Sequence, residues 1–174
     1  IRQLLFNRGY ASDEAARFFL KALSPYPTSP WQLKDMSKVI KRLDEAIQDQ
    51  QKIIIYGDYD VDGVTATALL VQILLALGAK VKEYIPNRFE EGYGLNKDAL
   101  DQLKANNTKL VLTVDCGIRS LEEAKHAKEI NLDLIISDHH HPGEILPEAF
   151  AIINPKQPGD SYPDKDLAGV GVAY

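Results

Sequence analysis

Acidic residues and histidines stand at three places where apolar segments of the sequence end. They are Asp58, Asp60 and Asp62 after the run 52–56, Asp115 after the run 110–114, and Asp138, His139, His140 and His141 after the run 132–137. Carboxylates gathered at one place would repel one another unless a cation lay among them. A ligand set of several carboxylates with one or two imidazoles suits Mn²⁺ or Mg²⁺, whereas structural zinc favours thiolates. The residue types therefore indicate a site for one or two divalent cations.

The elements that would position these residues alternate between strands and helices. Strands are predicted at 52–56, 79–85, 110–114, 132–137 and 150–153, and helices at 64–77, from Asn96 to about 105, and after a capping box that opens at Ser120. Apolar strands separated by helices are typical of an α/β domain whose parallel β-sheet carries helices on both faces. Because parallel strands end at one edge of a sheet, the acids and histidines should lie together there.

The first fifty residues have the pattern of helices, and Ser12 is a suitable N-cap for one of them. Ser29-Pro30-Trp31-Gln32 has the form of a capping box, and apolar residues then recur at spacings of three and four up to Ile47. These features predict a helix from about residue 30 to about residue 50. The prolines of SPYPTSP (24–30) indicate a linker. We therefore expect an N-terminal helical segment at 1–50, with its Pro-rich linker at 24–30, followed by an α/β domain at 51–174.

Composition narrows the class of protein further. The 174 residues are 45% apolar, which excludes disorder as the main state and is enough for one domain. A net charge of −5 gives no electrostatic reason to expect nucleic acid. Cys116 is the only cysteine, so no intramolecular disulfide can form, and we expect a reducing, cytoplasmic location. No apolar run reaches the roughly 18–20 residues of a membrane span, so no membrane partner is expected.

Two other motifs overlap the segment GDYDVDG (57–63). The spacing of its acids matches the opening of an EF-hand loop, but the twelfth position, which must be acidic, is Leu69. The EF-hand is therefore excluded. Asp60-Val61-Asp62-Gly63-Val64 also resembles the nucleophile motif of haloacid-dehalogenase-type phosphatases. That alternative stays open, although it leaves Asp58 and the histidines unexplained.

Three separated motifs resemble those of the DHH phosphoesterase superfamily. They are GDYDVDG (57–63), VDCG (114–117) and SDHHHPG (137–143), in this order. Further segments resemble its RecJ branch of single-strand-specific exonucleases, namely LLFNRGYASDEAARFFL (4–20), IPNRFEEGYGLN (85–96) and LAGVGVAY (167–174). The resemblance covers nearly all of the chain. It implies a DHH domain that binds two Mn²⁺ or Mg²⁺ ions, and stepwise release of 5′-mononucleotides from the 5′ end of single-stranded DNA.

The same resemblance implies a role for each residue of the three motifs. The implied metal ligands are Asp58, Asp60, Asp62, Asp115 and His139. His140 is placed near the scissile phosphate as a catalytic group, and Asp138 would orient a histidine. Many superfamily members carry a histidine where this chain has Tyr56, so the resemblance leaves one metal ligand or supporting contact of the site unassigned. RecJ proteins also have a further metal-binding Asp and a second domain after AGVGVAY. We therefore expect these 174 residues to be part of a longer protein, with little or no activity by themselves.

Three residues are candidates for holding the substrate. Arg88 and Arg119 follow strands and could contact phosphates, and Tyr93 could stack on a base. The alternative interpretation is that the two arginines lie in ordinary exposed loops and that the tyrosine only packs against its neighbours. The expected partner is single-stranded DNA, with a single-strand-binding protein or a helicase as possible partners of parts outside this chain. Two other functions remain open: a DHH phosphodiesterase that acts on short oligonucleotides or cyclic dinucleotides, and an inactive DNA-binding scaffold of the same fold.

Overall fold

Five parallel strands form one sheet in the computed structural model, which describes residues 1–20, 28–87, 92 and 94–174. The strands are β1 (Lys52–Gly57), β2 (Lys80–Tyr84), β3 (Thr108–Val114), β4 (Asp133–Ser137) and β5 (Ala151–Ile153). They are ordered β2-β1-β3-β4-β5, and every neighbouring pair is parallel. The predicted parallel sheet, including its fifth strand, is therefore confirmed.

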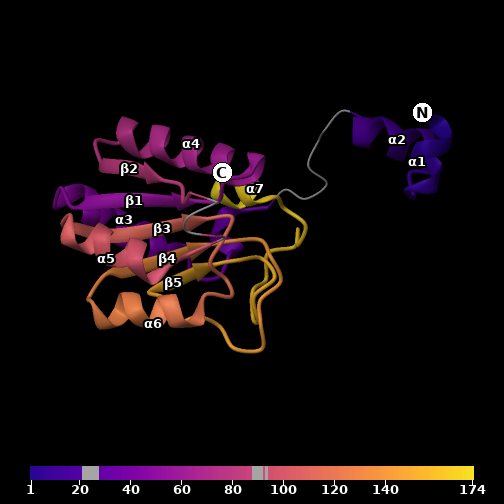
Figure 1. Cartoon of the computed structure of the whole chain (residues 1–174). Coiled ribbons are helices and arrows are strands. Elements are labelled where there is room, and N and C mark those ends of the chain that lie inside the picture. The colour runs from indigo at the N-terminus through magenta and orange to yellow at the C-terminus, as the bar shows by residue number, and fades with distance from the viewer. Residues whose placement is uncertain (21–27, 88–91, 93) are drawn as a thin grey trace.

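Helices cover both faces of the sheet, which confirms the predicted α/β class (Figure 1). One face carries α3 (Met36–Gln48), α4 (Val61–Ala76) and α7 (Gly169–Ala173), and the other carries α5 (Lys97–Ala105) and α6 (Leu121–Glu129). Side chains of β1 alternate between these layers, with Ile53 and Ile55 facing the first and Ile54 and Tyr56 the second. No helix among the described residues is both long enough and apolar enough to cross a bilayer.

The strand order changes direction between β1 and β3. The chain leaves β1 toward β2 on one side, and it returns on the other side of β1 to continue through β3, β4 and β5. Loops that follow two such strands depart in opposite directions, and this opens a crevice at the carboxyl edge of a parallel sheet. In Figure 1 the strand arrowheads point to this edge, where α7 also lies.

The beginning of α3 differs from the prediction. Pro30–Gln32 form a short 3₁₀ turn, η1, and Leu33 is extended with a ψ of 129°, so the α-helix begins at Met36. The Ser29 side chain makes no capping hydrogen bond. The predicted capping box is therefore wrong, because the chain tightens into a 3₁₀ turn and then straightens before the helix starts.

Caps elsewhere are partly as predicted. The Ser12 hydroxyl accepts the Ala15 N–H at 3.1 Å beside α2 (Asp13–Leu20), which follows α1 (Arg2–Asn7). The Asn96 side-chain Oδ1 caps α5 by accepting the Ala99 N–H at 2.7 Å. Ser120 precedes α6 as predicted, but its side chain makes no capping bond. Residues 24–27 of the predicted linker lie outside the described part of the chain.

A partly buried ion pair joins α3 to the start of β4. Arg42 is 8% exposed, and its Nε donates to Asp133 at 2.7 Å while an Nη donates to Gln51 at 2.8 Å. Asp133→Ala would leave this guanidinium buried with its main acceptor removed, so we expect it to lower the free energy of unfolding by about 1–3 kcal/mol. Urea unfolding measures this, with exposed Asp44→Ala from α3 as the control. Equal effects of the two substitutions would contradict a specific role for the pair.

Candidate metal centre

The loop after β1 carries three carboxylates into the crevice. Asp58 is 4% exposed, and its Oδ1 accepts the Tyr59 N–H at 2.7 Å. Asp60 is the N-cap of α4 and accepts the Gly63 N–H at 3.0 Å, which is why this helix begins three residues earlier than predicted. A Cβ on Gly63 would lie 2.5 Å from the Asp58 carbonyl oxygen, so glycine allows this tight turn. Asp62 then lies in the first turn of α4.

The residue after β3 is a buried carboxylate in an unusual backbone conformation. Asp115 is 2% exposed and has a φ of 61°, in the left-handed region that few residues other than glycine, Asn and Asp adopt. Its Oδ1 is buried and has no hydrogen-bond partner among the described residues. Burial, followed by the negative charges of Asp62 and Asp60, raises the pKa of Asp115 to about 7. The protein thus holds a carboxylate where, without a cation, charge is strongly disfavoured.

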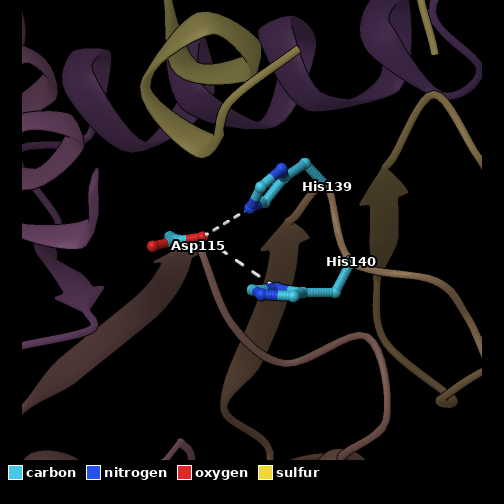
Figure 2. A group of neighbouring side chains, drawn as sticks. All are labelled: Asp115, His139 and His140. Atoms are coloured by element: carbon cyan, nitrogen blue, oxygen red, sulfur yellow. Dashed lines mark ion pairs between the residues drawn. The ribbon is translucent and has the colours of Figure 1, made fainter. Parts of the chain in front are cut away.

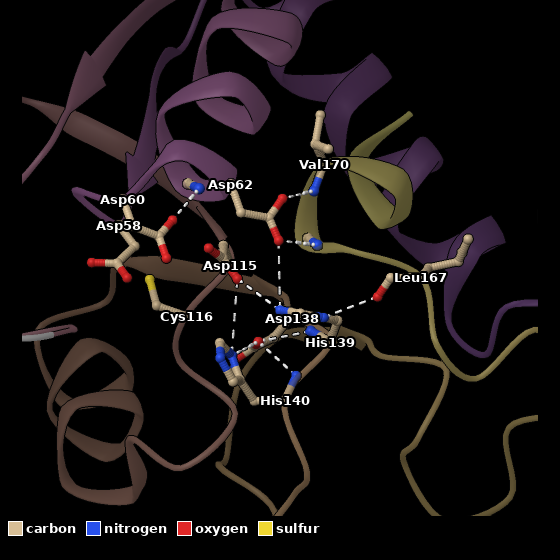
Figure 3. Close-up of polar contacts among 12 residues, drawn as sticks. Asp58, Asp60, Asp62, Asp115, Cys116, Asp138, His139, His140, Leu167 and Val170 are labelled. Atoms are coloured by element: carbon tan, nitrogen blue, oxygen red, sulfur yellow. Dashed lines mark hydrogen bonds and ion pairs between the residues drawn. The ribbon is translucent and has the colours of Figure 1, made fainter. Parts of the chain in front are cut away.

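The loop after β4 is organised around the Asp138 carboxylate, which is 1% exposed. Its Oδ1 accepts the backbone N–H of His139 at 2.7 Å and that of His140 at 3.1 Å, and also lies 2.7 Å from the His140 Nδ1. Its Oδ2 accepts the Ile118 N–H at 2.9 Å from the loop after β3. Asp138 therefore fixes the His140 ring and joins two of the loops that form the site (Figure 3).

Both histidine rings point toward Asp115 (Figure 2). The His139 Nδ1 lies 2.9 Å from the Leu167 carbonyl, which can only accept, so Nδ1 carries the hydrogen. The Nε2 of a neutral His139 ring then directs a lone pair to the Asp115 Oδ1 at 3.0 Å and to the Asp62 Oδ2 at 3.6 Å. The His140 Nδ1 lies 3.9 Å from the same Asp115 oxygen.

These residues fit a divalent cation. Two groups have ligand atoms within 4.8 Å of one another, namely Asp115 with His139 and His140, and Asp58 with Asp60 and Asp115. Adjacent ligands of an octahedral ion with bonds of about 2.1 Å lie about 3 Å apart, close to the 3.0 Å between the His139 Nε2 and the Asp115 Oδ1. A cation would also satisfy the orphaned Asp115 oxygen. Since Asp115 belongs to both groups, it could serve as a ligand in either one.

The predicted substrate contacts are only partly visible. Arg119 donates its Nε to the His141 carbonyl at 2.9 Å, and it lines a cavity of about 540 Å³ next to His140. Arg88 and Tyr93 lie outside the described residues. The site therefore has one candidate phosphate contact whose position is known.

Cys116 and Tyr56 lie near the site, and both are packed in the protein interior. Cys116 is buried, and burial together with the nearby carboxylates, Asp138 first, raises the pKa of its thiol well above the ordinary value. A buried neutral thiol is a poor nucleophile, and Cys116 instead donates to the Tyr56 carbonyl at 3.8 Å. The Tyr56 hydroxyl donates to the Gly94 carbonyl at 3.0 Å, and its ring stacks on Tyr84 with centroids 5.0 Å apart. The residue at position 56 thus packs below the crevice in the layer of α5 and α6.

Backbone groups complete the site, and side-chain patterns did not reveal them. The N–H groups of Gly169 and Val170 each donate to the Asp62 carboxylate at 2.7 Å. The Leu167 carbonyl accepts from His139, and the Ile118 N–H donates to Asp138. The sequence of residues 167–174 resembles RecJ sequences, but such a resemblance assigns no role to individual peptide groups.

The fold and the site together define a class. It is the class of α/β proteins that carry a carboxylate- and imidazole-rich site for divalent cations at the switch point of a parallel sheet. Residues 52–174, well over half of the chain, match the family model described as "DHH family, N-terminal domain". The chain belongs to the DHH family, which decides against the haloacid-dehalogenase alternative.

Curated relatives are similar over the whole chain. The single-stranded-DNA-specific exonuclease RecJ of Bacillus subtilis (strain 168) is 49% identical over 174 residues, which are 100% of this chain and 22% of that protein. The protein of the same name from Escherichia coli (strain K12) is 41% identical over 175 residues, covering 100% of this chain and 30% of that protein. The chain thus spans about a quarter of the length of these relatives.

Solved structures agree with the fold. A crystal structure described as exonuclease RecJ bound to manganese superposes with a TM-score of 0.75 at 37% identity, over 84% of this chain and 37% of that one. A RecJ from Thermus thermophilus in complex with Mn²⁺ gives a TM-score of 0.70 at 32% identity, over 91% of this chain and 23% of that one.

Proposed function

We propose that this chain is the cation-binding part of a single-strand-specific DNA exonuclease that depends on Mn²⁺ or Mg²⁺. The observation that carries the proposal is Asp115, a buried carboxylate with an orphaned oxygen that is shared by two groups of possible ligands. The relatives that cover the whole chain at 41–49% identity are named as single-stranded-DNA-specific exonucleases. Two of the similar structures are described with manganese bound.

The proposed ligands divide into two sets that share Asp115. Asp58, Asp60 and Asp115 form one set. The other consists of Asp115, His139 and Asp62, whose Oδ2 lies 3.6 Å from the His139 Nε2; here Asp62 takes the place of His140, which is assigned to the phosphate. Two divalent cations bound there would lower the pKa of water to near neutrality and neutralise charge on the phosphodiester and the leaving oxygen. The loops after β1, β3 and β4 hold these ligand side chains in place before substrate binds, and this is the contribution of the chain itself.

His140 is proposed to act on the phosphate. Its Nδ1 is held by the Asp138 carboxylate at 2.7 Å, and the ring, with 47% of its side chain exposed, lines the cavity beside Arg119. A ring held in this way is positioned to donate its Nε2–H to a non-bridging phosphate oxygen. Arg119, whose Nε is tied to the His141 carbonyl, is left with two Nη groups for another phosphate. Arg88 and Tyr93 remain proposed contacts for a phosphate and a base.

The proposed function is tested with the full-length protein and single strands labelled at the 5′ or the 3′ end. With Mn²⁺ or Mg²⁺, we expect 5′-mononucleotides to be released from the 5′ end, and a chelator should abolish the reaction. Degradation without metal, or a preference for duplex, would overturn the proposal. Cleavage restricted to short oligonucleotides or cyclic dinucleotides would favour the alternative phosphodiesterase. Cation binding without any cleavage would favour the scaffold.

His140→Ala is expected to separate a phosphate contact from a metal ligand. Loss of one donor to the developing charge should lower kcat by about 10²–10³-fold. Mn²⁺ affinity should change little, because His139 supplies the imidazole of the ligand set. His141→Ala is the matched control, since His141 bonds Arg119 through its backbone carbonyl, which the substitution keeps. A loss of Mn²⁺ affinity as large as the loss of kcat would show instead that His140 is a ligand.

A further inference from the structure

The segment from Leu167 to Val170, here called the brace, contacts three residues of the candidate metal centre. It holds Asp62 and His139 through peptide groups, and the Gly169 main chain lies against Asp115. We infer that the brace is a positioning element that sets the cation affinity of the site, although it supplies no ligand itself. The inference rests on the cation site of the proposed function.

The first contact fixes the Asp62 carboxylate. The Gly169 N–H donates to its Oδ2 and the Val170 N–H to its Oδ1, each at 2.7 Å. These N–H groups lie in the first turn of α7, where they have no partner within the helix. Hydrogen bonds to a carboxylate are strong, and two of them leave a single rotamer for the side chain. Each oxygen keeps a lone pair that can face a cation.

The second contact fixes the tautomer of His139. The Leu167 carbonyl accepts the Nδ1–H at 2.9 Å, so Nε2 is the nitrogen that faces Asp115 and Asp62. An outer partner of this kind orients a ligating imidazole and increases its basicity, and its loss typically weakens metal binding by about 10–100-fold.

The third contact explains why the brace contains a glycine. A Cβ on Gly169 would lie 2.8 Å from the Asp115 Cβ and 2.9 Å from its Cγ and Oδ1, closer than real side chains approach. Any other residue would therefore displace either the brace or Asp115. Asp62, Asp115 and His139 follow three different strands, and the brace contacts all three of them.

Gly169→Ala tests the inference, with Gly171→Ala from the same short helix as the matched control. A Cβ on Gly171 would meet only Leu167 side-chain atoms, at 3.5 Å or more, so that variant should bind Mn²⁺ as the wild type does. In the full-length protein we expect Gly169→Ala to weaken Mn²⁺ binding by about 10–100-fold in calorimetric titration. The electron paramagnetic resonance spectrum at saturating Mn²⁺ should change as well, because the ligands move.

Val170→Pro provides a second variant that places no new atom beside Asp115. Proline is tolerated in the first turn of a helix, and here its ring replaces the N–H that Asp62 accepts, so the carboxylate loses one hydrogen bond and must move away from the ring. We expect weaker Mn²⁺ binding again, and the metal-free melting temperature shows that the variant is folded. Unchanged affinity in this variant and in Gly169→Ala, or an equal loss in Gly171→Ala, would overturn the inference.

The readout is independent of nuclease activity. If the wild type binds Mn²⁺ but does not degrade single strands, the proposed function fails, and the brace is still judged by the affinities of the variants. If the wild type binds no Mn²⁺, the inference is overturned together with the metal centre. If Gly169→Ala does not fold, the Mn²⁺ affinity of Val170→Pro tests the inference.

Discussion

In the full-length protein, Asp115→Asn is expected to remove tight Mn²⁺ binding, to slow the proposed degradation of single-stranded DNA by about 10³-fold or more, and to make the metal-free protein more stable at pH 8. Asp115 belongs to both groups of possible ligands, so its loss should impair both ions together. Asparagine also accepts the left-handed backbone conformation at this position, where φ is 61°. The substitution therefore removes the charge and leaves the turn intact.

The expected gain in stability follows from the raised pKa of Asp115. Burial, with the charges of Asp62 and Asp60, raises that pKa to about 7, whereas an aspartate in an unfolded chain titrates near about 3.9. Between these values the folded protein binds more protons than the unfolded one, so stability falls as the pH rises. Metal-free wild type should lose roughly 1–3 kcal/mol between pH 5 and pH 8. The loss should be much smaller in Asp115→Asn, which cannot titrate there.

Thermal unfolding in chelator at the two pH values, together with Mn²⁺ titration, measures both effects. Asp35→Asn is the control, because Asp35 also has a left-handed backbone (φ of 65°) and lies outside the site, where it accepts the Ile152 N–H at 3.2 Å. It should leave Mn²⁺ affinity unchanged. Wild-type affinity in Asp115→Asn would contradict the shared-ligand assignment, and a lower stability at pH 8 would contradict the account of the buried charge.

Asp138→Ala is expected to have the second largest effect, on stability and turnover together. Its carboxylate accepts the N–H groups of Ile118, His139 and His140 and also holds the His140 ring. Removal would leave the buried Ile118 N–H and the partly buried N–H groups of His139 and His140 without this acceptor, so we expect the free energy of unfolding to fall by about 3–5 kcal/mol. A free His140 ring should lower kcat by about 10²–10³-fold.

Measurements at low temperature separate the loss of turnover in Asp138→Ala from its loss of stability. Turnover measured well below the midpoint of thermal unfolding should still be low, because the ring is misplaced in the folded protein. Exposed Glu129→Gln should change neither quantity. Wild-type turnover of the folded variant would show that Asp138 has only a structural role.

The sequence predicted the position of the candidate site well. A buried strand can be recognised from a run such as 52–56, and the carboxyl ends of parallel strands must share an edge. Asp58, Asp115 and His139 could therefore be brought together without coordinates. The fold class followed from the same alternation of strands and helices.

The sequence was less informative about helix starts and about the backbone of the site. Ser29 and Ser120 have the residue types of caps, but capping also depends on local dihedral angles that no pattern specifies. The N–H groups of Gly169 and Val170 are invisible to any argument from side chains, because every residue except proline has one. Only the packing of α7 against α4 and β3 shows which carboxylate receives them.

The bond between Asp62 and Gly169 spans 107 residues of sequence. A ribosome that makes this chain therefore delivers the carboxylates of GDYDVDG long before the peptide groups that align one of them. Contacts so distant along the chain close late and slow the folding of a domain. The order of synthesis thus delays completion of the site until nearly all of this chain has been made.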